Sequence, residues 1–278
     1  MVLVLFDFDG TISQSDTIGA LAHSAIDHSP NPPLLKAAWD GIVQAYLADY
    51  ENHVSTYSPR APDRMTVDSE VSFLESLRAI EEASVERVQQ ARLFAGLEGG
   101  RMGDLAEWAR ETDQVSARQG FYGFVEEIVK IRGWNVGVVS VNWSRDWVDS
   151  FCQQMMVNIV SCPEGMIEGP TGLGRLVTAG DKLKAASSVM RRVGEKVSVY
   201  IGDSVTDMAC LLKASLGIIM AQDRSSKLLR TLDRLGFDVP HAGDDREAQR
   251  LIWARNFDEI VDSKILDLVK KVVKRSGN

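Results

Sequence analysis

The chain has 278 residues, of which 45% are apolar and 25% are charged, and these values are ordinary for a globular protein. Its formal net charge of −8 argues against an extended nucleic-acid interface, which would need a basic face. No stretch approaches the roughly 18 uninterrupted apolar residues of a membrane span, and the opening run Met1–Phe6 is too short for a signal peptide. We therefore expect a soluble, cytoplasmic protein that binds neither membranes nor nucleic acids.

Short apolar runs recur along the chain and have the pattern of strands that are covered on both faces. They are Val2–Phe6, Val136–Val139, Val197–Ile201 and Gly217–Met220. Amphipathic segments typical of helices, such as Phe121–Ile131 and Leu183–Val193, lie between or beside these runs. This alternation predicts an α/β fold with a Rossmann-like, doubly wound parallel sheet.

The segment between the first two runs departs from this alternation. From Asp16 to about Ala117 it contains helical patterns, for example over Leu34–Tyr50 and Val67–Leu97, and no convincing strand. About 100 helical residues are too many for one crossover connection between parallel strands. We therefore expect an inserted α-helical cap domain at residues 16–117 and a core domain that comprises residues 1–15 and 118–278.

Two aspartates, Asp7 and Asp9, directly follow the first apolar run, at the sheet edge where open α/β sheets bind ligands. Residues two apart in an extended chain point to the same side, so their carboxylates would repel each other unless a cation or a shared proton joined them. A hard divalent cation such as Mg²⁺ would take these oxygen ligands. The alternative is a merely polar exit from the strand.

A second acidic pair follows a different apolar run. Asp203 comes just after Val197–Ile201, and Asp207 lies four residues later. If a helix begins at Ser204 or Val205, both carboxylates can face the same crevice. Two strand ends that offer carboxylates to one crevice make a metal site far more plausible than either pair alone.

Two further residues have the character of anion ligands. Ser140 ends the run Val136–Val139, where its hydroxyl and the following backbone N–H groups could hold an anionic oxygen, or where it could simply cap a helix. Lys182 lies at an expected helix start, where the helix dipole disfavours a lysine. It either binds an anion there or is an ordinary solvated side chain.

The order Asp7/Asp9, Ser140, Lys182, Asp203/Asp207 resembles the four signature motifs of the haloacid dehalogenase superfamily. The helical insertion resembles the cap of its phosphoserine-phosphatase-like branch. Arg118-Gln119-Gly120 is similar to that branch's Arg-Pro-Gly return to the core, with Gln in place of Pro. Dehalogenases lack the second aspartate of the first motif, so its presence favours a phosphatase.

The resemblance implies a Mg²⁺-dependent phosphatase that hydrolyses a small phosphomonoester through an aspartyl-phosphate intermediate. It assigns catalytic roles to Asp7 as nucleophile, Asp9 as general acid and base, Lys182 and Asp207. It assigns the metal to Asp7, Asp203 and Asp9, the last through its backbone carbonyl. It assigns substrate binding to Thr11, Asp16, Ser140, Val141 and Asn142, although Asp16 could instead cap the first helix of the insertion. A phosphomutase or phosphotransferase, or a catalytically silent binding protein of the same fold, remains an alternative.

The loop after Ser140 bears on the substrate. It contains Trp143 and Arg145, which could border the substrate or simply pack against the next helix, and it departs from the Ser-Gly-Gly of many phosphoserine phosphatases. Similar Trp-bearing loops occur in fungal and plant relatives, including phosphatase domains associated with vitamin phosphates such as thiamin monophosphate. The resemblance is therefore compatible with a vitamin or amino-alcohol phosphate among the small phosphomonoesters. The protein is expected to be a monomer or a homodimer. Candidates for an aromatic lining, or alternatively for helix core, are Trp39, Tyr46, Tyr50 and His53.

Overall fold

The structure is a computed structural model and describes residues 2–97, 101–152, 158–160, 176–194, 197–244 and 249–269. Residues 270–278 of the expected core domain therefore lie outside the described residues. A six-stranded sheet has the order β3-β2-β1-β4-β5-β6, and each pair of neighbours is parallel. Its strands are β1 Val2–Phe6, β2 Asn135–Val139, β3 Asn158–Val160, β4 Val197–Gly202, β5 Leu216–Met220 and β6 Leu251–Ala254. The predicted α/β fold class is confirmed.

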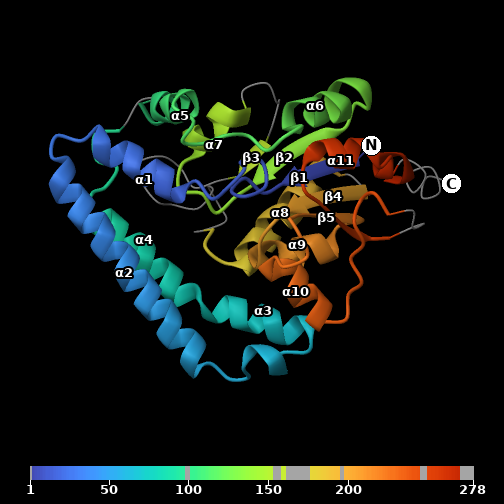
Figure 1. Cartoon of the computed structure of the whole chain (residues 1–278), viewed down its shortest axis with the longest axis horizontal. Helices are drawn as coiled ribbons and strands as arrows, with labels where there is room; N and C mark the ends of the chain where they lie inside the picture. Colours follow the sequence, from blue (N-terminus) through green and yellow to red (C-terminus); the bar gives the residue numbers. More distant parts are fainter. Residues whose placement is uncertain are drawn as a thin grey trace.

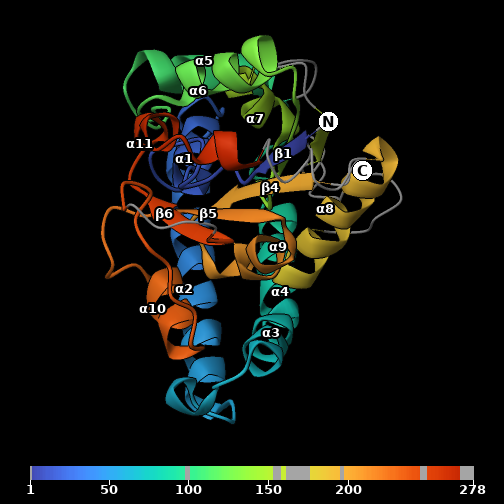
Figure 2. The ribbon, with the colours of Figure 1, turned by 90° about the vertical axis from the view of Figure 1, so that its right-hand side faces the viewer.

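Alternate residues of β1 point to opposite faces of the sheet, and each face is covered by helices (Figure 1, Figure 2). Val2, Val4 and Phe6 belong to a core shared with α1 Ile18–Asp27, α5 Arg101–Glu111, α6 Phe121–Glu126, α7 Arg145–Cys152 and α11 Phe257–Asp262. Leu3 and Leu5 belong to a second core with α8 Ala179–Val193, α9 Met208–Lys213 and α10 Lys227–Arg234. Among the described helices, none is long and apolar enough to cross a membrane.

The segment between β1 and β2 builds a layer of helices outside the sheet. We call α2 Pro32–Thr56, α3 Val67–Ser76 and α4 Arg78–Gln90, residues 32–90, the helical arm. Asn31 caps α2 by accepting a hydrogen bond from the backbone of Leu34, and prolines occupy its first turn, where they fit best. In Figure 1, α2 and α4 run beside each other away from α1, and α3 returns beneath α8 and α10.

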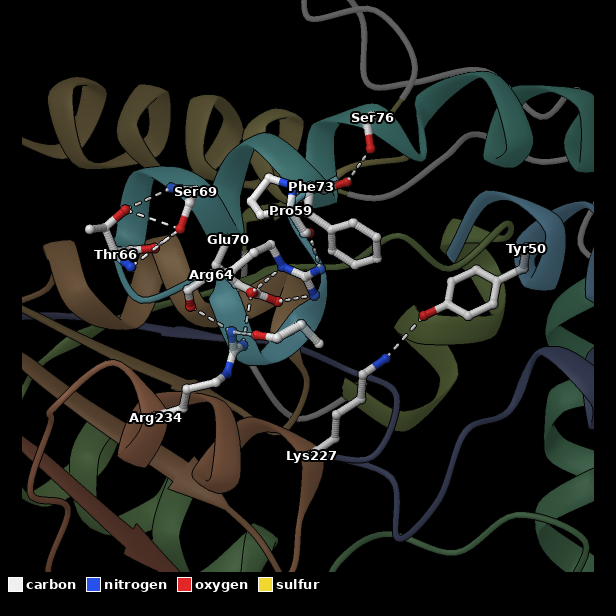
Figure 3. A network of polar contacts seen from close by, with 11 residues as sticks. Tyr50, Pro59, Arg64, Thr66, Ser69, Glu70, Phe73, Ser76, Lys227 and Arg234 are labelled. Carbon is white, nitrogen blue, oxygen red and sulfur yellow. Dashed lines mark hydrogen bonds and ion pairs between the residues drawn. The ribbon is translucent and has the colours of Figure 1, made fainter. Parts of the chain in front are cut away.

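The far end of the helical arm is fixed to α10 (Figure 3). Glu70 of α3 accepts hydrogen bonds from Arg64 at 2.7 Å and from Arg234 of α10 at 2.8 Å, both at the same carboxylate oxygen. Beside them, the Lys227 ammonium donates to the Tyr50 hydroxyl at 3.1 Å. We call this group of five residues the tip contact. It joins the arm to the sheet-bearing part of the chain at a distance from the strand ends.

Candidate active site

The residues singled out in the sequence lie where three adjacent strands end. Asp7 follows the central strand β1, Ser140 follows β2 and Asp203 follows β4, so the parallel sheet brings them to one edge. Lys182 reaches the same edge from the first turn of α8. Asp7 is 3% exposed and both Ser140 and Lys182 are fully buried, so the edge is closed over by other elements.

Three carboxylates form a compact cluster at this edge. Oxygen atoms of Asp7, Asp203 and Asp207 all lie within 4.8 Å of one another. Burial, with the charge of Asp207 adding to it, raises the pKa of Asp7 well above its usual range and the pKa of Asp203 to about 7. Crowded carboxylates that are costly to ionise together are a donor set suited to Mg²⁺, which prefers oxygen ligands. The residues present therefore fit the ion.

Lys182 supplies one positive charge to this cluster. Its Nζ atom lies 2.7 Å from an oxygen of Asp7 and 2.7 Å from an oxygen of Asp207. Burial opposes the charge, but the two carboxylates outweigh it and raise the pKa of Lys182 above its usual value. Asp207 is held in turn by the Tyr200 hydroxyl at 2.8 Å and by the backbone N–H of Ser204 at 3.1 Å. The lysine is thus a fixed cation beside Asp7.

The Asp9 carboxylate is held apart from the cluster. It accepts hydrogen bonds from the hydroxyl and backbone N–H of Thr17, at 2.6 and 2.8 Å, and from the Asn142 side chain at 2.9 Å. The Trp147 indole donates to the same Thr17 hydroxyl at 3.0 Å. Burial raises the pKa of Asp9 to about 6; the charge of Asp16 adds to the rise, and the bonds from Thr17 and Asn142 oppose it. A carboxyl group with this pKa can both donate and accept a proton near neutrality.

The remaining predicted substrate ligands are spread over different surroundings. Val141 and Asp16 line the pocket described below. Asn142 instead holds Asp9, and the Ser140 hydroxyl accepts a hydrogen bond from the Asn142 backbone at 2.9 Å. The Thr11 hydroxyl contacts Asp203 at 3.3 Å, on the side of the carboxylate cluster.

A pocket of about 480 Å³ lies between the strand ends and the helical arm. Asp7, Asp9, Asp203 and Lys182 line one side of it. The helices contribute the residues Trp39, Ile42, Val43, Tyr46, Glu81, Ser84 and Val85. Of the expected aromatic lining, Trp39 and Tyr46 do line the pocket, whereas Tyr50 belongs to the tip contact and His53 is hydrogen-bonded to Ser76.

The turn after Asp9 is shaped by a glycine and a buried arginine. Gly10 has φ +70°, and a Cβ there would come within 2.4 Å of an Asp203 carboxylate oxygen, so both conformation and space require glycine. The Arg118 guanidinium donates to the carbonyl oxygens of Gly10 and Thr11, the latter at 3.1 Å. The return of the chain to the core thus fixes the loop that carries the two aspartates.

Two residues that orient Asp9 were not predicted. Thr17 and Trp147 orient Asp9, yet neither belongs to a recognisable pattern in the sequence. The only signal that points to them is their place: each lies within the segment directly after a strand-end motif, Thr17 after Asp7–Ile12 and Trp147 after Ser140.

Comparisons with known proteins place the chain in a family. Residues 4–212 match the model of haloacid dehalogenase-like hydrolases. A CTO1 family protein of Schizosaccharomyces pombe is 25% identical over 245 residues, which cover 80% of this chain and 83% of that protein. The bifunctional TH2 protein, mitochondrial, of Arabidopsis thaliana is 25% identical over 264 residues, which cover 84% of this chain but 42% of that protein.

The fold also resembles a solved structure, the phospho-aspartyl intermediate analogue of phosphoserine phosphatase. The two share 17% sequence identity with a TM-score of 0.51, over 94% of this chain and 97% of the other. That likeness concerns the fold, whereas the family model matches most of the sequence, from β1 through α9. The chain therefore belongs to the haloacid dehalogenase-like hydrolase family.

Proposed function

We propose that the protein is a Mg²⁺-dependent phosphatase that hydrolyses a small phosphomonoester through an aspartyl-phosphate on Asp7. One observation carries the proposal: the Asp7 carboxylate lines a pocket of about 480 Å³ with Lys182 at 2.7 Å and two further carboxylates close by. Family membership supports a hydrolase. The division into a core domain, residues 1–15 and 118–278, and a cap domain, residues 16–117, is part of the same proposal.

In the first half of the reaction an Asp7 oxygen attacks phosphorus, and the bond between phosphorus and the leaving oxygen breaks. Asp9 donates its proton to that oxygen, for which a pKa of about 6 suits it. Lys182 neutralises negative charge beside Asp7, and Asp207 holds Lys182 in place. The products of this half are the alcohol and the phosphorylated Asp7.

In the second half Asp9, now ionised, accepts a proton from a water molecule that attacks the phosphorylated Asp7. The bond between phosphorus and the Asp7 oxygen breaks, which releases phosphate and regenerates the enzyme. Mg²⁺, held by Asp7, Asp203 and the Asp9 carbonyl, would supply positive charge for the phosphoryl oxygens. Thr17 and Asn142 keep Asp9 oriented in both halves through their hydrogen bonds to it.

The pocket lining favours a particular kind of leaving group. Trp39 and Trp143 lie edge to face with ring centres 6.1 Å apart, and Ile42 adds apolar surface. The Glu81 carboxylate also lines the pocket and accepts a hydrogen bond from the Tyr46 hydroxyl at 3.0 Å. An apolar body with a hydrogen-bond donor would complement these walls. A vitamin or amino-alcohol phosphate has this character.

Phosphate release from a panel of phosphomonoesters tests the proposal, with p-nitrophenyl phosphate included and with either Mg²⁺ or a chelator. We expect release by the wild-type protein with Mg²⁺ and none by Asp7→Asn. Asp40→Asn is the matched control, since Asp40 lies exposed on α2 and pairs only with Lys36 among its described contacts. With a ³²P-labelled substrate, acid quenching should trap label on the wild type and not on Asp7→Asn.

Each other outcome points to a different function. Label that passes to an added alcohol rather than to water would indicate a phosphotransferase or phosphomutase. Release that survives Asp7→Asn would refute Asp7 as nucleophile. No release and no trapped label with any compound would favour the silent binding protein.

A further inference from the structure

The first turn of α8 is the place where the helical arm meets the element that carries Lys182. Thr178 caps this helix, and its hydroxyl accepts a hydrogen bond from the backbone of Asp181 at 3.3 Å. Asp181 immediately precedes Lys182. A contact that restrains Asp181 therefore also restrains the backbone of Lys182, whose side chain extends to Asp7.

Arg78, the first residue of α4, binds Asp181 through two hydrogen bonds. One guanidinium nitrogen donates to one carboxylate oxygen at 2.9 Å, and the other nitrogen donates to the second oxygen at 2.8 Å. The second nitrogen also donates to the Thr178 hydroxyl at 3.0 Å. A two-pronged pairing of arginine with carboxylate fixes orientation as well as distance. Arg78 is thus hydrogen-bonded both to Thr178, which caps α8, and to Asp181, the third residue of α8.

Glu75, at the end of α3, makes a second contact with the same turn and also accepts a hydrogen bond from Arg78 at 3.3 Å. Its carboxylate accepts a hydrogen bond from the backbone N–H of Gly180 at 2.6 Å. A Cβ on Gly180 would lie 2.4 Å from that carboxylate oxygen, so the arm approaches α8 as closely as a residue without a side chain allows. One acidic side chain of the arm, Glu75, and one basic side chain, Arg78, therefore both contact the first turn of α8.

The tip contact and the contact of Arg78 and Glu75 with α8 differ in their position relative to the pocket. The tip contact fixes the arm to α10, and none of its residues lines the pocket. The contact at α8 is bordered by pocket residues on both sides: Val177 precedes Thr178, and Glu81 lies three residues after Arg78, on the same side of α4. Pocket residues therefore flank the contact at α8, whereas the tip contact lies apart from the pocket.

We propose that Arg78 and Glu75 are positioning residues for Lys182. By holding the first turn of α8, they place the lysine beside Asp7. The proposal rests on the proposed function, because the role of Lys182 belongs to it. A displacement of the lysine by about 1 Å would cost up to ~100-fold in rate. Because pocket residues flank this contact, binding of the leaving group against α4 would stabilise it and so contribute to the chemical step, and not to affinity alone.

Steady-state kinetics of Arg78→Gln test the proposal against two matched controls. Lys184→Gln removes a different cation, 3.8 Å from the same Asp181, that is 73% exposed and belongs to α8 itself. Arg234→Gln breaks the tip contact and leaves α8 untouched. We expect kcat to fall about 10–100-fold in Arg78→Gln with KM within about twofold, and both controls to stay within about twofold of wild type. Added guanidinium should restore part of the kcat of Arg78→Ala.

Hydrogen exchange supplies a readout that needs no turnover. In Arg78→Gln, backbone amides of residues 176–186 should exchange at least ~10-fold faster than in either control, because the turn has lost its contact with the arm. A wild-type protein without phosphatase activity would refute the proposed function, while the exchange rates would still decide whether the arm holds α8.

Three outcomes would overturn the inference. Exchange in Arg78→Gln equal to that in Lys184→Gln would mean that the arm does not hold the turn. Equal losses of kcat in Arg78→Gln and Arg234→Gln would mean that a weakened attachment of the arm at either place lowers kcat, so that Arg78 has no specific role in positioning Lys182. A rise in KM at constant kcat would make Arg78 a contributor to binding alone.

Discussion

Replacing Lys182 by methionine tests whether this buried cation neutralises the carboxylates around it. The lysine side chain is fully buried, and its Nζ atom lies 2.7 Å from both Asp7 and Asp207. Methionine has a similar length and volume, so the change removes the charge and leaves little cavity. Breaking a buried ion pair by removing one partner costs about 3–5 kcal/mol, and we expect the free energy of unfolding to fall by that amount at pH 7 without divalent cations.

A double-mutant cycle separates the charge effect from any packing effect. In Asp7→Asn/Lys182→Met one of the two uncompensated carboxylates is gone, so the two losses should not add. We expect an interaction energy of about 1–3 kcal/mol between the two positions. Mg²⁺ should stabilise Lys182→Met more than it stabilises the wild type, because the carboxylates that fit the ion then have no competing cation.

Urea unfolding followed by circular dichroism, with chelator present, measures these free energies. Lys184→Met is the control: this lysine is 73% exposed, and its replacement should change the free energy of unfolding by less than about 0.5 kcal/mol. A loss below about 1 kcal/mol in Lys182→Met would refute the reasoning. It would mean that the carboxylates around Lys182 do not depend on it for neutralisation.

Other substitutions test the supports of the site and of the arm. Gly202→Ala places a Cβ 2.5 Å from the Asp207 side chain, so kcat should fall more than ~10-fold. Trp147→Phe loses the hydrogen bond to Thr17 and leaves a cavity where the fully buried indole was, so urea unfolding should show a loss of about 2–4 kcal/mol. Burial opposes the charge of Glu70, but bonds from Arg64 and Arg234 lower its pKa. Its stabilisation is therefore present at pH 7 and lost as the pH falls below 4.5, so Glu70→Gln should be less stable than wild type by about 1–3 kcal/mol at pH 7, with the gap closing in acid.

Each of these expectations has a result that would contradict it. An unchanged kcat in Gly202→Ala would mean that Asp207 can move without consequence. A stability of Trp147→Phe equal to that of wild type would leave the indole N–H without a role. A gap between wild type and Glu70→Gln that stays constant from pH 7 to pH 3 would show that the charge of Glu70 is not what holds the tip contact.

The parallel sheet and the location of the site could be predicted because each motif directly follows an apolar run. Runs ending at Phe6, Val139 and Ile201 identify strands, and the carboxyl ends of parallel strands meet at one edge. Asp7 and Asp203 therefore had to lie at the same edge, and they lie close together because β1 and β4 are neighbours in the sheet. The functional roles of these residues stay predictions until activity is measured.

Short elements and long-range partners could not be predicted. The edge strands β3 and β6 have three and four residues, too few for a pattern to stand out. The helical pattern over Val67–Leu97 gave no sign that it would divide at Leu77 into α3 and α4. Arg78 and Asp181 are 103 positions apart, and no local rule pairs two charges at that separation.

The central position of β1 has a consequence for how the protein is made. Leu3 pairs with Asn135 of β2, and Val2 pairs with Val197 of β4, so the first strand of the core gains its hydrogen-bonding neighbours late in synthesis. Such a topology has a high contact order and folds slowly. Until β2 emerges, the apolar run Val2–Phe6 is an unpaired strand of the kind that aggregates, and its other edge stays open until β4 emerges. Substitutions that slow the pairing of β4 with β1 would then lower the yield of folded protein. The molecules that do fold would keep the same structure.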